Sequence, residues 1–220
     1  MFAADGSRVV TSPLVIPGVW RGERQREAIP TESTGIRQLD DLLLGGWPKA
    51  SLTQLVSSDD GFGLSVLLPT LAKLTQAGRP IAFVQPPHQP CAPALVSQGL
   101  DIKQLLWVQT KNTTQALWAF EQLLRGGLHA AVVYWGSAMD CTTERRLQLA
   151  AETGKGLAFC FRTGGEDSHS YAAARLSLKP EGQGSADLGI QVLKCRGVRA
   201  GRRVRHVGYS PVPLLRDPRI

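Results

Sequence analysis

The chain has 220 residues, of which 43% are hydrophobic, a composition that suits one domain with a sizeable core and argues against a fibrous or globally disordered protein. Its apolar stretches are interrupted well short of the roughly 20 residues that span a bilayer, and no apolar run follows a basic start, so we expect a cytoplasmic protein without a membrane partner. The four cysteines are scattered singly, which argues against a disulfide framework or a metal site.

The net charge of +7 is unevenly distributed along the chain. Of the 25 basic and 18 acidic residues, eight basic and one acidic lie in residues 190–220, which leaves 17 of each sign in residues 1–189. A neutral body with a cationic end predicts an acidic partner, and nucleic acid is the leading candidate.

Three segments differ in pattern. Residues 1–29 contain prolines and a charged run, which indicates an N-terminal arm. In residues 30–170, apolar runs at 52–56, 81–84, 105–108, 130–135 and 157–161 predict strands, and the stretches 64–76, 91–98, 113–125 and 142–152 predict helices. Thr113 and Thr142 are predicted to cap two of these helices. Continuous apolar strands separated by helices predict an α/β core, a parallel sheet with helices on both faces.

Residues 171–220 show a third pattern. The segments 175–178, 189–194 and 203–207 alternate in polarity like strands and are joined by glycine-rich turns. They predict a C-terminal antiparallel β extension on the edge of the sheet, ending in a basic tail.

The loop after the first core strand has the context of a phosphate loop. Residues 57–65, SSDDGFGLS, lie between a predicted strand and a predicted helix, as G-x-x-x-x-G-K-[ST] does. Gly63 and Ser65 match this motif, whereas Ser58 replaces the first glycine and Leu64 replaces the phosphate-binding lysine. Two aspartates in the loop would also repel a polyanion. Taken alone, the loop is better explained as an ordinary strand-to-helix turn.

The flanking segments resemble the entry to RecA-type ATPase cores. S-T-G-x-x-x-L-D stands at residues 33–40 and G-G-x-P at 45–48, ahead of the strand and the loop. Residues 83–88, FVQPPH, are similar to the RecA segment that carries the water-activating acid, and Pro87 stands in its place. The strand 130–135 resembles Walker B but ends in Tyr134 and Trp135 instead of a metal-binding Asp. The resemblance implies a RecA-like core with a degenerate nucleotide site, without cofactor, metal or catalytic residue.

Further segments resemble the ImuA family of SOS-induced proteins associated with translesion DNA synthesis. The similarity covers residues 19–196 and is carried by VWRG, GGWP, PPHQPCAPAL, QALWAFEQ and RRLQLAAE. ImuA-like proteins work beside ImuB, an inactive Y-family polymerase relative, and an error-prone replicative-type polymerase. The resemblance implies a non-catalytic accessory protein of SOS mutagenesis, with DNA, RecA and these polymerases as partners. SulA proteins, which block FtsZ assembly, share this ancestry, so a SulA-like division inhibitor is the alternative; a divergent active nucleotidase is a third possibility.

Two sets of residues are candidates for contacts with partners. Cations of the C-terminal segment would neutralise phosphates and release counterions; alternatively, they protect a solvated edge hairpin from aggregation. No aromatic residue alternates with them, so the sequence does not support base stacking. Val19, Trp20 and Trp47 lie in loop-like contexts and are candidate partner anchors, with packing inside the chain as the alternative; Trp107 and Trp118 fit core positions. The candidate DNA contacts are Lys194, Arg196, Arg199, Arg202, Arg203 and Arg205.

Overall fold

The computed structural model describes residues 30–57, 62–136, 139–164, 170–181 and 187–207. These residues build one eight-stranded sheet in the order β10-β9-β8-β3-β7-β6-β4-β5, and a small sheet of β1 (Thr31–Glu32) and β2 (Trp47–Pro48). The large sheet contains β3 (Ser51–Ser57), β4 (Ile81–Val84), β5 (Leu105–Val108), β6 (Ala131–Trp135), β7 (Leu157–Thr163), β8 (Ala174–Pro180), β9 (Asp187–Cys195) and β10 (Arg203–Val207).

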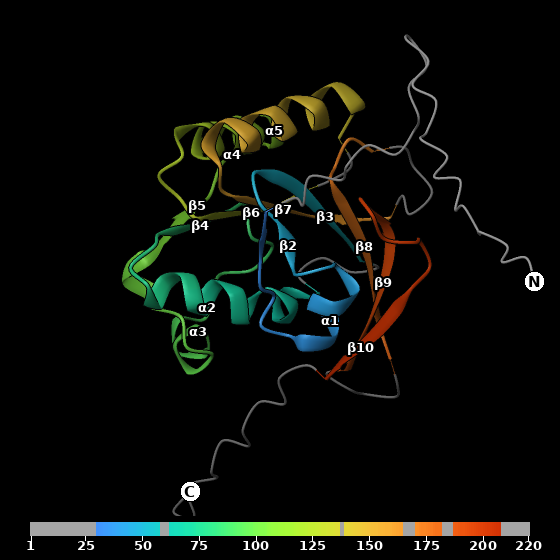
Figure 1. The fold of residues 1–220 in the computed structure, drawn as a ribbon. Coiled ribbons are helices and arrows are strands. Elements are labelled where there is room, and N and C mark those ends of the chain that lie inside the picture. Colours follow the sequence, from blue (N-terminus) through green and yellow to red (C-terminus); the bar gives the residue numbers. More distant parts are fainter. Residues whose placement is uncertain (1–29, 58–61, 137–138, 165–169, 182–186, 208–220) are drawn as a thin grey trace, which may run out of the picture.

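Helices cover both faces of this sheet, as the sequence predicts (Figure 1). On one face lie α1 (Arg37–Leu42), α2 (Leu68–Gln76) and α3 (Ala92–Ser97), and on the other α4 (Thr113–Gly126) and α5 (Cys141–Gly154). Alternate residues of a central strand therefore point into two different cores. In β6, Val133 and Trp135 pack on the first side and Val132 and Tyr134 on the second. Burial on both faces explains why the central strands read as continuous apolar runs.

The predicted antiparallel extension is confirmed, and its first strand joins the core in parallel. β9 runs antiparallel to β8 and to β10, but β8 runs parallel to β3. The chain returns to the amino edge of the sheet before β8 begins, where the Ala173 backbone N–H donates to the Leu52 carbonyl over 2.9 Å. Alternation along a strand reports its two faces but not its direction, so the pattern alone cannot distinguish these cases.

The helix starts differ from the predicted caps. Asn112 caps α4, its side chain accepting a hydrogen bond from the Gln115 N–H at 2.9 Å, and Asp140 caps α5 by accepting from the Thr143 N–H at 2.7 Å. Thr113 and Thr142 are therefore helical residues. Both Asn and Asp precede the predicted threonines in the chain and are at least as good as Thr at satisfying the first free N–H groups of a helix.

For Trp47 the structure selects packing inside the chain over the role of a partner anchor, and it contradicts the core positions expected of Trp107 and Trp118. Trp47 is fully buried, with its ring 5.2 Å from that of Phe159 in an edge-on contact, so it does not present a surface to a partner. Trp107 and Trp118, by contrast, are 41% and 64% exposed. Trp107 lies on the edge strand β5, and Trp118 points away from the buried side of α4, which is formed by Ala116, Phe120 and Leu124.

Several expectations fall on residues outside the described part of the chain. These are the arm 1–29, which includes Val19 and Trp20, and Ser58 of the loop. Within the described residues, no helix combines the length and the apolar character needed to cross a bilayer.

Candidate functional site

The S-T-G-x-x-x-L-D segment forms a tight turn closed by its own aspartate. Asp40 accepts a hydrogen bond from the Ser33 hydroxyl at 2.7 Å and another from the Thr34 N–H at 2.6 Å. Gly35 has φ of 77°, and a Cβ there would lie 2.6 Å from Cβ of Pro69, the second residue of α2. The turn therefore needs glycine both for its backbone and for its close approach to α2.

The G-G-x-P segment packs against the same helix. Gly46 has φ of 121°, and a Cβ there would lie 2.2 Å from the Glu32 carbonyl oxygen. The Glu32 carboxylate lies 2.9 Å from Lys49 and 3.2 Å from Lys73 of α2. Burial raises the pKa of Glu32, but its hydrogen bonds and charge contacts with these two lysines outweigh burial and lower it overall. The two motifs thus fasten the entry of the core onto α2, the helix that follows the phosphate-type loop.

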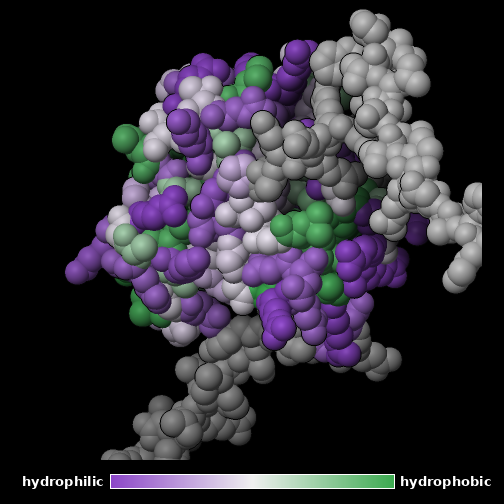
Figure 2. Space-filling model, viewed as in Figure 1, coloured by the Kyte–Doolittle hydropathy of each residue, from purple (hydrophilic) through white to green (hydrophobic). Residues whose placement is uncertain are grey.

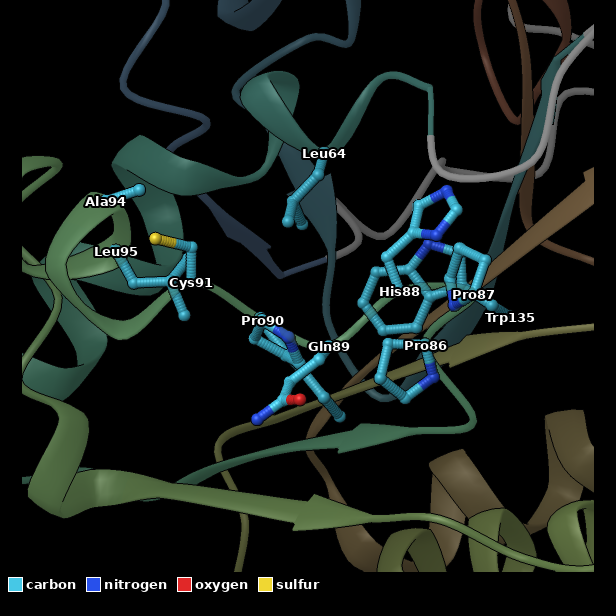
Figure 3. A pocket seen from close by; sticks show the side chains of 11 residues that line it. Leu64, Pro86, Pro87, His88, Gln89, Pro90, Cys91, Ala94, Leu95 and Trp135 are labelled. Carbon is cyan, nitrogen blue, oxygen red and sulfur yellow. The ribbon is translucent and has the colours of Figure 1, made fainter.

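Three residues from distant parts of the sequence meet at the carboxyl edge of the sheet. Leu64 follows β3, Pro87 follows β4 and Trp135 ends β6, and all three line one cavity of about 170 Å³ (Figure 3). Leu64 lies between the Cys91–Leu95 segment on one side and Pro87 with Trp135 on the other. Leu64 and Pro87 stand where the sequence predicts the loss of the phosphate lysine and of the catalytic acid. Of Tyr134 and Trp135, which replace the metal-binding acid, Trp135 lines the cavity, whereas Tyr134 packs in the core on the other face of the sheet. The fold brings Leu64, Pro87 and Trp135 together.

The lining of this cavity is mostly apolar where a nucleotide site needs charge, although His88 and Gln89 also border it. Trp135 is 6% exposed and stacks on Phe161 at a centroid distance of 5.3 Å, with Phe83 edge-on at 5.1 Å. Among the described residues, its indole N–H finds no hydrogen-bond partner. Leucine, proline and tryptophan side chains offer neither a cation for phosphate nor a carboxylate for Mg²⁺.

The residues next to the loop also depart from the predicted helix. The segment 64–76 is divided into a 3-10 turn, Leu64–Val66, and α2, which has Pro69 in its first turn. Gly63 precedes the turn with φ of 94°, and a Cβ there would lie 2.4 Å from Leu178 of β8. A positive φ and the close approach to Leu178 therefore account for glycine at position 63 without a phosphate.

The candidate DNA contacts lie on the last two strands and the turn that joins them. Lys194 is near the end of β9, Arg196, Arg199 and Arg202 are in the turn, and Arg203 begins β10; all of them are exposed. We call these five residues the cationic turn. Figure 2 shows hydrophilic side chains gathered over β9 and β10 on the face in view.

Arg205 stands apart from this group. Its guanidinium hydrogen-bonds the Asp187 carboxylate and lies 3.8 Å from Glu181. The hydrogen bond and charge of Asp187 raise the pKa of Arg205 further above its ordinary value. Asp187 and Glu181, which precede Arg205 by 18 and 24 residues in the sequence but lie beside it in the fold, thus offset its charge.

The structure also adds residues that the sequence did not single out. Tyr171 and Lys49 lie in one cleft of about 440 Å³ together with Lys194 and Arg196 of the cationic turn. No local pattern could have found this group, because Lys49, Tyr171 and Lys194 come from three segments that only the strand order brings to the same edge.

Known proteins resemble this chain in sequence and in fold. The family model described as cell division inhibitor SulA matches residues 51–158. RecA of Prochlorococcus marinus (strain MIT 9211) is 30% identical over 112 residues, and RecA of Streptomyces venezuelae is 31% identical over 107. These matches cover 51% and 48% of this chain but only 30% and 28% of the two RecA proteins.

The structural similarity extends further than the sequence similarity. A crystal structure of the RadB recombinase superposes with a TM-score of 0.64 at 15% sequence identity, covering 79% of this chain and 94% of that one. The predicted RecA-like fold is therefore confirmed. Together, the similarities support membership of a RecA/SulA-like superfamily. The chain spans less than a third of the length of the RecA proteins that it matches.

Proposed function

We propose that this protein is a non-catalytic, RecA-like accessory factor of the SOS response that binds partners of DNA-damage tolerance. Similarity to RecA and to the SulA family model supports a role related to DNA damage. The observation that carries the non-catalytic part is the meeting of Leu64, Pro87 and Trp135 in one apolar cavity. A RecA-type nucleotide site would need a cation and two carboxylates at these positions.

The finer proposal is an ImuA-type role in translesion synthesis. In this role the protein works in the cytoplasm with an ImuB-type inactive Y-family polymerase, an error-prone replicative polymerase, RecA and DNA. The resemblance of residues 19–196 to ImuA-like proteins motivates these partners. The cationic turn supports contact with DNA, because five exposed cations at one end of a hairpin can neutralise several phosphates.

A SulA-like inhibitor of FtsZ assembly is the second candidate. It is favoured by the match of the SulA family model to residues 51–158, which include the cavity-lining residues Leu64, Pro87 and Trp135. The two candidates differ in partner and not in fold, so only binding experiments separate them.

The test is a set of pairwise binding measurements with the full chain immobilised. Purified ImuB-type protein, RecA and FtsZ are passed over it, each with and without duplex DNA. Saturable binding of ImuB-type protein or RecA, with no response to FtsZ, supports the ImuA-type role. Saturable binding of FtsZ alone, with inhibition of its assembly measured by light scattering, overturns that role in favour of the second candidate.

A further inference from the structure

A cleft at the amino edge of the sheet joins the cationic turn to an exposed aromatic ring. Its lining includes Lys49 ahead of β3, Tyr171 ahead of β8, and Lys194, Cys195 and Arg196 at the end of β9. The volume of about 440 Å³ lies within the roughly 300–1,000 Å³ that is typical of small-ligand sites. This cleft is at the opposite edge of the sheet from the apolar cavity, because parallel strands carry their amino and carboxyl ends to opposite edges.

Three consecutive backbone N–H groups, those of residues 171–173, each donate a hydrogen bond to a different residue. The Tyr171 N–H donates to the Glu144 carboxylate at 3.0 Å, and the Ala172 N–H to the Ser170 hydroxyl at 3.1 Å. The Ala173 N–H donates to the Leu52 carbonyl at 2.9 Å. With its backbone fixed in this way, Tyr171 still leaves its side chain available, since the residue is 52% exposed. A large exposed ring on a fixed backbone is a preorganised stacking surface.

Glu144 is itself part of a buried network. It is 1% exposed, accepts from the Gln54 side-chain amide at 2.7 Å, and pairs with the Arg162 guanidinium at 3.3 Å. These partners hold the carboxylate in one position, so the carboxylate in turn positions the Tyr171 backbone. The network therefore belongs to the core and supports the cleft from below.

The charges of the cleft favour an anion. Lys194 donates to the neutral Ser170 carbonyl at 2.7 Å. Among the described residues, neither Lys194 nor Arg196 has an acidic partner within 4.0 Å. Lys49 is paired with Glu32 outside the cleft. The acid in the lining is Glu152, whose carboxylate accepts from the Gln148 amide at 2.9 Å. Lys194 and Arg196 together therefore outweigh the negative charge of Glu152 in the lining.

We propose that this cleft binds an unpaired nucleotide of single-stranded DNA, with the base stacked on Tyr171 and the adjacent phosphate held by Lys194 and Arg196. The proposal rests on the DNA binding proposed above and deepens it. Stacking requires a base that is not already stacked in a duplex, whereas phosphate contacts do not discriminate between the two forms. The ring therefore gives the protein a preference for single strands that the cationic turn alone cannot supply.

The experiment compares fluorescein-labelled oligothymidylate with a labelled duplex of the same length, by fluorescence anisotropy on the full chain. Replacing Tyr171→Leu removes the ring and should weaken single-strand binding about tenfold, because stacking of one base contributes about 1–3 kcal/mol and 1.4 kcal/mol corresponds to tenfold. Duplex affinity and its salt dependence should not change. Tyr171→Phe keeps the ring and should bind like the parent.

Two controls make the outcomes distinguishable. Trp118→Leu removes another exposed aromatic, on α4, and should leave both affinities unchanged; thermal unfolding checks that each variant is folded. If the parent binds both DNAs and Tyr171→Leu binds the single strand equally well, the cleft proposal is wrong while DNA binding stands. If the parent binds neither DNA, both proposals are wrong.

Discussion

The indole N–H of Trp47 donates a hydrogen bond to the Thr70 hydroxyl over 3.0 Å in the core. That hydroxyl in turn lies 3.1 Å from both the Ser33 and the Thr34 carbonyl oxygen, between which its single proton is shared. One threonine of α2 therefore serves both the S-T-G-x-x-x-L-D turn and the tryptophan of the G-G-x-P segment. The two entry motifs are coupled through a buried side chain, which explains their occurrence together without any reference to nucleotide.

Replacing this hydroxyl should cost stability out of proportion to its size. Thr70→Val keeps the shape but leaves the Trp47 N–H and the two carbonyls without their shared partner. We expect a loss of about 1–3 kcal/mol in the free energy of unfolding, measured by urea denaturation. The exposed Thr153 of α5, whose hydroxyl donates to the Leu149 carbonyl, offers the matched control Thr153→Val. Equal effects at the two positions would contradict the role given to Thr70.

Two glycines with positive φ should respond differently to alanine. Gly46 and Gly78 have φ of 121° and 69°, but a Cβ would collide with the Glu32 carbonyl only at Gly46, since nothing lies within 4 Å at Gly78. Gly78→Ala should lose about 1–2 kcal/mol from backbone strain alone, while Gly46→Ala should lose distinctly more or fail to fold. Thermal unfolding of the two variants decides this, and similar midpoints would show that the close approach at Gly46 relaxes freely.

The pairing of Glu32 predicts a pH-dependent contribution to stability. Because lysine contacts lower its pKa in the folded state, its contribution is fully present above the unfolded pKa of about 4.5 and is lost as pH falls through the folded value. Glu32→Gln should therefore lower the free energy of unfolding at pH 7 and reduce its loss on acidification below about pH 4.5. Urea unfolding of parent and variant at a series of pH values measures both. Parallel pH profiles would mean that the ion pairs contribute nothing.

A single lysine should not restore nucleotide binding. Leu64→Lys supplies the missing cation, but Pro87 and the buried Trp135 still occupy the positions of the two acids. Calorimetry with Mg-ATP should detect no micromolar binding to the parent or to the variant, and phosphate release should stay at the buffer rate. Saturable, Mg-dependent turnover by the parent would overturn the proposal of a non-catalytic site.

The cationic turn and Arg205 should contribute unequally to duplex binding. Removing one side chain that neutralises a phosphate should reduce the salt dependence by about 0.9 log unit of affinity per decade of salt. The triple variant Arg199→Ala, Arg202→Ala, Arg203→Ala should flatten this slope clearly. Arg205→Ala should change it little, because Asp187 and Glu181 already offset that charge. Anisotropy titrations at several salt concentrations measure the slopes, and an unchanged slope in the triple variant would identify the turn as a solvated edge.

Much of the fold was accessible from the sequence because it depends on local patterns. The strands 81–84 and 105–108 were predicted with the bounds that the structure has, since a short run of apolar residues between helices has few alternatives to a parallel strand. That 81–84 is buried and 105–108 is a half-exposed edge strand could not be read from the two runs. The identities of Leu64, Pro87 and the pair Tyr134 and Trp135 also predicted that three chemical groups are missing. These conclusions need only the order of residues along the chain and the chemistry of each side chain.

Other features depend on which segments become neighbours, and only the tertiary structure decided them. Trp47 lies in a loop-like sequence but is buried because α2 and β7 close over it, while Trp118 lies in a helical apolar pattern but points to solvent. Tyr171 reaches the cationic turn because β8 pairs with both β3 and β9. Local periodicity indicates which face of a helix or strand is apolar. The strand order determines what that face packs against, and this order is set by contacts between residues far apart in the chain.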